Sequence, residues 1–116
     1  MSVPGLDAQT PGFSITTTAG DGEWRVAVAG ELDLLTSPRL REALTTVVDD
    51  EQPGALVADL SGVTFFDSSA LNTLLQVQRH AQEREVAMSV VASAAVERVI
   101  TLAGVDEHLT WSAAEA

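Results

Sequence analysis

Residues 55–75, ALVADLSGVTFFDSSALNTLL, join an apolar segment to an amphipathic one through a short polar motif. The first part, residues 55–60, is almost continuously apolar and is bounded by turn residues, which is typical of a central strand buried on both faces. After the motif, apolar residues recur at the spacing of one helix face: Leu71, Leu74, Leu75 and Val77. The stretch therefore predicts a strand followed by a helix, with Asp67, Ser68 and Ser69 at the junction.

Strands and helices also alternate on both sides of this stretch. Upstream, the runs 13–18 and 23–30 flank a short Gly-rich turn and predict an antiparallel hairpin. A helix then begins at Thr36 or Ser37, either of which can cap it, with Pro38 in its first turn.

Downstream, residues 86–91 predict a strand, residues 92–104 a helix that ends at Gly104, and residues 108–111 a short last strand. The order is β-β-α-β-α-β-α-β. It predicts an α/β fold with a mostly parallel mixed sheet, an antiparallel edge strand and packed helices.

The chain length of 116 residues predicts one domain. Residues 1–12 contain Pro and Gly without an apolar period and predict a flexible leader, followed by the domain at 13–111 and a tail at 112–116. No apolar stretch approaches the ~20 residues that cross a bilayer, and the N-terminus lacks signal-peptide features, which predicts a cytoplasmic protein. The absence of cysteine excludes disulfides, thiolate nucleophiles and sulfur metal sites.

The charge is strongly acidic, with 17 Asp and Glu against six basic residues and a formal net charge of −11. Nucleic acid is a poor partner for such a surface, whereas a protein with a basic patch fits it. All six basic residues are Arg. The lack of Lys excludes a P-loop and a Schiff-base enzyme.

An enzyme that uses Ser69 or Asp67 is poorly supported. A serine hydrolase needs a base, but the two histidines, His80 and His108, are far along the chain, and no G-x-S-x-G motif surrounds Ser69. Asp67 as a phosphoryl acceptor lacks a neighbouring carboxylate for Mg²⁺ and a Lys for the phosphate. The acidic run 49–51 is typical of a solvated helix end rather than a metal site, and the histidines are typical of structural positions.

The motif itself has two interpretations. If Asp67 or Ser68 caps the helix, Ser69 lies in the first turn, where free N–H groups and the helix dipole favour a phosphate. Phosphorylation adds about −1.5 to −2 charge, which would repel an acidic partner surface and act as a switch. Asp-Ser-Ser before a helix is ordinary capping chemistry, so the motif alone favours a simple cap over a switch.

Three segments together resemble a known family: residues 26–44, VAVAGELDLLTSPRLREAL; residues 56–75, which include DLSGVTFFDSS; and residues 91–105, VASAAVERVITLAGV. In order and spacing they resemble the STAS domain of bacterial anti-sigma factor antagonists, from about residue 13 to 111. In that family the second Ser of the motif accepts phosphate from an anti-sigma factor that is a serine kinase. The resemblance therefore implies Ser69 as the acceptor.

The same resemblance implies roles for the surrounding residues. Asp67 and Ser68 would shape the acceptor pocket, and Asp33 of the GELD element would lie beside it at the partner-binding edge, with Thr36 near it as a cap. Without the family, Asp33 is simply a turn residue. Ala70 stands where the family often has Gly, and its methyl group is expected to narrow the approach of a kinase.

The implied function is that of a binding protein rather than an enzyme. Unphosphorylated, it would bind the anti-sigma factor kinase and release a sigma factor; phosphorylated, it would let go, and a serine phosphatase would reset it. ATP and Mg²⁺ would belong to the kinase, so no cofactor, metal, nucleic acid or membrane is expected. Two alternatives remain: a STAS subunit of a transporter-associated or stress-sensing complex that docks constitutively, and a small enzyme acting through Asp67 and Ser69.

Overall fold

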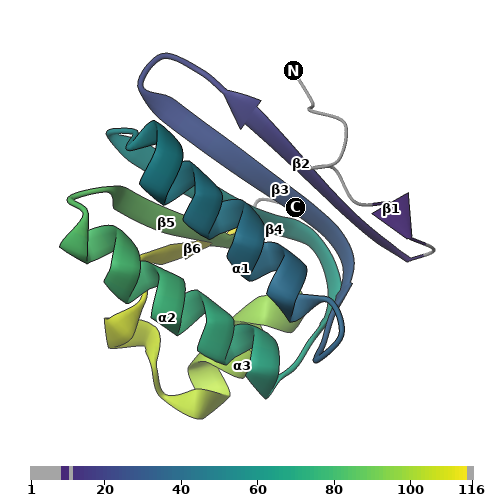
Figure 1. The fold of residues 1–116 in the computed structure, drawn as a ribbon. Coiled ribbons are helices and arrows are strands. Elements are labelled where there is room, and N and C mark those ends of the chain that lie inside the picture. Colours follow the sequence, from purple (N-terminus) through teal and green to yellow (C-terminus); the bar gives the residue numbers. More distant parts are fainter. Residues whose placement is uncertain (1–8, 11, 115–116) are drawn as a thin grey trace.

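The computed structural model describes residues 9–10 and 12–114, and they form a six-stranded mixed sheet with helices packed on it (Figure 1). The strands lie in the sheet in chain order. The pairs β1–β2 and β2–β3 are antiparallel, and the pairs β3–β4, β4–β5 and β5–β6 are parallel. Their bounds are β1 (Gln9–Thr10), β2 (Phe13–Ala19), β3 (Glu23–Leu32), β4 (Ala55–Phe66), β5 (Ala87–Ala92) and β6 (Trp111–Ala113). The predicted α/β class and the antiparallel edge are confirmed.

The helices alternate with the parallel strands, as predicted. Figure 1 shows α1 and α2 side by side across the sheet. The helical elements are α1 (Ser37–Thr46), which continues as the π-helical turn η1 (Val47–Glu51), α2 (Ser68–Glu83), α3 (Ala94–Ala103) and the 3₁₀ turn η2 (Asp106–His108). None of the helices in the described part of the chain is long and apolar enough to span a membrane.

Strand β4 lies at the centre of the parallel part of the sheet, as predicted, but it is not buried on both faces. Leu56, Ala58 and Leu60 are fully buried. The residues between them are half-buried, and Asp59 pairs with the exposed Arg25 of β3 at 2.7 Å. The ion pair of Asp59 and Arg25 explains the difference, because two charged groups keep that face partly in water.

The ends of the chain differ from the predicted boundaries. The predicted leader, residues 1–12, lies mostly outside the described residues, but Gln9–Thr10 form β1 against β2. The last strand was expected at 108–111 and lies at Trp111–Ala113, inside part of the expected tail. The reason is that residues 106–108 form a 3₁₀ turn, so the strand cannot begin at His108. In addition, the N–H of Thr110 donates to the side chain of Gln78 at 3.4 Å instead of to a strand.

Gly30, the first residue of the GELD segment, lies in close contact with the backbone of Gly12. Its φ is +104°, and a Cβ atom at this position would lie 1.7 Å from the carbonyl oxygen of Gly12. The same oxygen accepts the N–H of Glu31 at 3.1 Å. A side chain at residue 30 would therefore separate β3 from the turn between β1 and β2.

Candidate functional site

The junction between β4 and α2 forms around the carboxylate of Asp67. Asp67 has extended backbone angles (φ −117°, ψ −176°) and is the N-cap residue of α2. One of its oxygens, Oδ1, accepts the N–H of Ala70 at 3.1 Å and the hydroxyl of Ser69 at 2.6 Å. A single oxygen atom thus caps the helix and orients the second hydroxyl of the motif.

The three residues after Asp67 have different environments. Ser68 is exposed, and its hydroxyl makes no hydrogen bond to any described residue. Ser69 is half-buried and bonded to Asp67. Ala70 is fully buried, so its methyl group packs in the core. The expectation that this methyl group narrows the approach of a kinase to Ser69 is therefore wrong, because the methyl group does not lie at the surface.

Asp33 organises the loop between β3 and α1. Its Oδ1 accepts the backbone N–H groups of Leu35 at 2.9 Å and Thr36 at 3.1 Å. These hydrogen bonds, first among them the one from Thr36, hold the pKa of Asp33 below its usual value of 3.8, although partial desolvation acts in the opposite direction. The carboxylate is thus a structural part of the loop as well as a surface charge.

Thr36 occupies the N-cap position of α1, as predicted, but its side chain does not cap the helix. Its hydroxyl accepts the N–H of Asp33 and lies 2.9 Å from the carbonyl oxygen of Glu31, to which it can donate. Ser37, the other predicted cap, donates its hydroxyl to the carbonyl oxygen of Asp33 at 2.7 Å. Both hydroxyls therefore tie the helix to the loop before it, and the Thr36 oxygen accepts a loop N–H, that of Asp33, in place of a helix N–H.

The two carboxylates lie at the ends of neighbouring parallel strands. Leu32 of β3 pairs with Phe66 of β4 at the end of the ladder, and Asp33 and Asp67 are the next residues on each strand. The N–H of Asp67 donates to the carbonyl oxygen of Leu32 at 3.3 Å, which joins the two loops. The structure thus brings the GELD and Asp-Ser-Ser elements to one edge of the sheet.

This edge also has two features that the sequence patterns did not single out. Leu34 and Leu35 are 73% and 83% exposed, although both are large apolar residues. Beside them is a surface hollow of about 290 Å³, lined by Gly12, Phe13, Glu31, Asp33, Leu35, Thr36 and Arg39. The signal in the sequence was an apolar pair that belongs to no helix or strand period.

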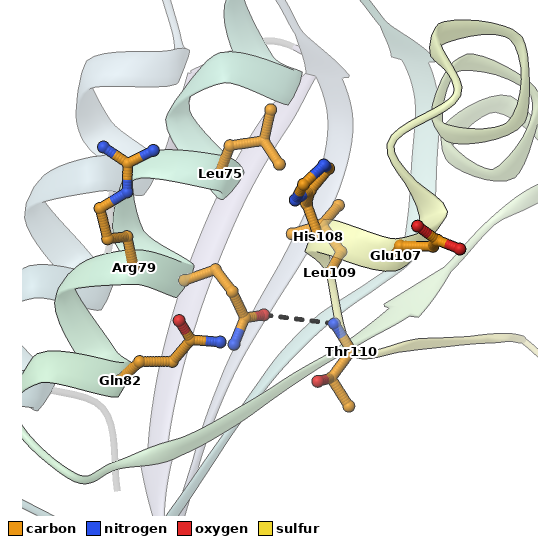
Figure 2. A pocket seen from close by; sticks show the side chains of 8 residues that line it. Leu75, Arg79, Gln82, Glu107, His108, Leu109 and Thr110 are labelled. Carbon is orange, nitrogen blue, oxygen red and sulfur yellow. Dashed lines mark hydrogen bonds between the residues drawn. The ribbon is translucent and has the colours of Figure 1, made fainter.

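A larger cavity, of about 370 Å³, lies between α2 and residues 107–110 (Figure 2). Gln78 is 3% exposed beside it; its side chain donates to the carbonyl oxygen of Met88 at 3.3 Å and accepts the N–H of Thr110. This glutamine, also missed from the sequence, joins α2 to β5 and to Thr110, the residue before β6. The cavity does not include Ser69, so it belongs to a different part of the molecule.

Neither histidine contacts Ser69 or Asp67. His108 lines the cavity of Figure 2, and Nε2 of His80 lies 2.7 Å from Oδ1 of Asp49, in a hydrogen bond between α2 and η1. The predicted structural role of His80 fits this position. Among the described residues, no group of three or more His, Asp and Glu is placed to hold a metal ion.

Comparisons with known proteins agree with this architecture. The family model described as "Mlab, STAS domain" matches residues 15–110. The anti-sigma-F factor antagonist RsfB of Mycobacterium tuberculosis is 40% identical over 97 residues, which cover 81% of this chain and 78% of RsfB.

Two solved structures are similar in fold. The anti-sigma factor antagonist of Mycobacterium paratuberculosis has a TM-score of 0.72 and 32% identity, over 96% of this chain and 89% of that one. The phosphorylated form of the Bacillus cell fate determinant SpoIIAA has a TM-score of 0.67 over 87% of this chain and 91% of its own, at 16% identity, which shows a shared fold.

Proposed function

This chain belongs to the STAS domain family, and we propose that it is an anti-sigma factor antagonist that is switched off by phosphorylation of Ser69. Unphosphorylated, it binds an anti-sigma factor that is a serine kinase, and the sigma factor is released. Phosphorylated, it dissociates, and a serine phosphatase resets it. The identity to RsfB supports the antagonist function, and the hydrogen bond from Ser69 to Asp67 supports the choice of hydroxyl.

The chemistry of the site fits such a switch. The Asp67 carboxylate holds the Ser69 hydroxyl 2.6 Å away and polarises its O–H bond, which prepares the oxygen to attack a phosphoryl group. Transfer forms a bond between the Ser69 oxygen and the γ-phosphorus of the kinase's ATP, breaks the bond from that phosphorus to ADP, and releases the hydroxyl proton to a base of the kinase. Phosphoserine can therefore no longer donate to Asp67. ATP and Mg²⁺ are supplied by the kinase in this proposal.

Phosphate then changes the charge of the docking surface. It adds about −1.5 to −2 charge beside Asp67, on the edge that also carries Asp33. The free N–H groups of the first turn of α2 partly compensate this charge within the chain. They do not compensate the repulsion of acidic groups on a bound partner, or the cost of desolvating a phosphate under it.

The remaining residues of the site take supporting roles in this proposal. Asp33 and Thr36 shape the neighbouring loop at the partner-binding edge, exposed Ser68 borders the acceptor, and buried Ala70 presents its N–H to Asp67. The chain acts as a binding protein rather than an enzyme, in the cytoplasm. Its net charge of −11 disfavours nucleic acid and anionic membranes as partners.

Binding measurements test the proposal. The purified chain is titrated with each anti-sigma factor encoded in the genome that encodes it, before and after phosphorylation by that factor. Wild type and Ser69→Ala should bind one factor with similar affinity, whereas phosphorylated wild type and Ser69→Asp should bind it more weakly. Ser68→Asp is the control, because it places the same charge one residue away.

Equal affinities for wild type, phosphorylated wild type and Ser69→Asp would place the docking surface elsewhere. Binding that persists in all forms, to a transporter or stress-sensing assembly, would favour the constitutive STAS subunit instead.

A further inference from the structure

The loop of residues 33–36 displays two adjacent leucines to solvent next to the site. Leu34 is 73% exposed and Leu35 is 83% exposed. Single exposed apolar residues are common on protein surfaces and need no explanation. Two neighbouring leucines in a short connection are different, because a link from a strand to a helix can be made with polar residues alone.

The loop that carries the leucines is held rigidly. The Asp33 carboxylate accepts the N–H groups of Leu35 and Thr36, and the Thr36 hydroxyl accepts the N–H of Asp33. The backbone on both sides of Leu34 is thus fixed before any partner arrives. A fixed loop loses little conformational entropy on binding, so the leucines are preorganised for contact.

The surroundings of the leucines indicate the chemistry of the occupant. Leu35 borders the hollow of about 290 Å³, and its lining also includes two acidic residues, Glu31 and Asp33, and one basic residue, Arg39. Oδ1 of Asp33 accepts hydrogen bonds from the loop, but the charge of the group is retained, since its pKa lies below 3.8. The two carboxylates against one guanidinium favour a basic side chain in the hollow.

We propose that Leu34 and Leu35 anchor the anti-sigma factor: they pack into an apolar depression on that protein, and an arginine or lysine beside the depression enters the hollow next to Glu31. This inference rests on the proposed function, since the anti-sigma factor that the leucines contact is the partner named there. The loop of Asp33 is joined to the acceptor loop through the bond from Asp67 N–H to the Leu32 carbonyl oxygen. Anchor and switch therefore lie on one edge, where a partner can contact both.

The test separates apolar from charged contributions. Titration calorimetry with the anti-sigma factor that binds wild type is carried out at low and high salt. The double variant Leu34→Ser/Leu35→Ser should bind about tenfold more weakly or worse at both salt concentrations, because burial of leucine is not screened by salt. Glu31→Gln should bind more weakly at low salt only, because screened charges lose their effect at high salt.

Leu102→Ser is the matched control. Leu102 is 80% exposed on α3 and does not line the hollow, so its loss should leave the affinity unchanged. The single variants Leu34→Ala and Leu35→Ala, with melting curves for every protein, keep the test valid if the double variant unfolds.

The outcomes are distinct for the two proposals. If wild type binds an anti-sigma factor and the folded leucine variants bind equally well, the anchor is overturned and the proposed function stands. If wild type binds none of the factors, the proposed function fails, and the anchor with it. If the leucine variants lose self-association in sedimentation experiments but keep full affinity for the factor, the leucines serve a contact between copies of this chain, which also overturns the anchor.

Discussion

The hydroxyl of Ser69 donates a 2.6 Å hydrogen bond to Oδ1 of Asp67, the oxygen that also accepts the N–H of Ala70. Capping of a helix and orientation of a candidate phosphoacceptor are therefore performed by one atom. The two interpretations of the Asp-Ser-Ser motif are not exclusive in this geometry. A substitution that keeps an oxygen at residue 67 but removes its charge can separate the capping role from the role in orienting Ser69.

Asp67→Asn is expected to melt near the wild-type temperature but to accept phosphate more slowly. Asn supplies an oxygen to the Ala70 N–H but lacks the charge that strengthens the bond from Ser69. Asp67→Ala should also lose about 0.5 to 2 kcal/mol of unfolding free energy. Thermal melting and the initial rate of phosphorylation give the two quantities.

Ser93→Ala is the control for Asp67, because Ser93 caps α3 through the N–H of Val96 and lies in a different loop. It should lose stability without slowing phosphorylation. If stability and phosphorylation fall in step across both Asp67 variants, the residue is only a cap.

Acid should remove the contribution of Asp33 to stability. Its pKa is lower in the folded protein than the usual 3.8, so the ionised form favours the folded state. This stabilisation is fully present above the unfolded-state pKa and is lost as the pH falls through the folded-state pKa. The difference in urea midpoint between wild type and Asp33→Asn should therefore be constant from pH 7 to about pH 5 and shrink below pH 3.8. A difference that grows on acidification would contradict this assignment.

Gly30→Ala should destabilise the fold far more than Gly104→Ala. Both glycines have positive φ, at +104° and +69°, but only Gly30 has a backbone atom, the carbonyl oxygen of Gly12, where a Cβ would lie. Gly104→Ala should cost about 1 to 2 kcal/mol for the left-handed conformation alone. Chemical denaturation of the two variants measures this, and equal losses would mean that the approach of Gly12 is not required.

Gln78→Met should lower the unfolding free energy by about 1 to 3 kcal/mol, because it leaves the Met88 carbonyl and the Thr110 N–H without their partner. Gln82→Met, on the same helix but exposed, is the control and should change the stability by less than about 0.5 kcal/mol. A neutral Gln78→Met would show that the apolar gain offsets both lost hydrogen bonds.

The local signals in the sequence predicted the fold well. Apolar periods located each helix and the four longer strands, and short-range chemistry located two helix ends: Asp67 caps α2, and Gly104 ends α3 with φ +69°. These features depend on residues within about one helical turn of each other, which is why a sequence pattern can contain them. The residues after β4 were predicted to be a site from the resemblance to the STAS family, because the local motif alone predicts only a helix cap.

What the sequence patterns could not contain are hydrogen bonds made by irregular loops and contacts between distant residues. Thr36 has the right type for a cap, but its hydroxyl is taken by the loop of Asp33 and Glu31. The pair of His80 and Asp49 joins positions 31 residues apart. The exposure of Leu34 and Leu35 likewise depends on how the loop leaves the sheet, which periodicity does not determine.

The most direct test of the central claim is to locate the phosphate. The chain is incubated with ATP and the anti-sigma factor that binds it, its intact mass is measured, and the modified peptide is mapped. We expect one phosphoryl group per chain, located on Ser69, and none on Ser69→Ala. Phosphate on Ser68 or on a threonine, or an unmodified chain after incubation with a factor that binds it, would contradict the account.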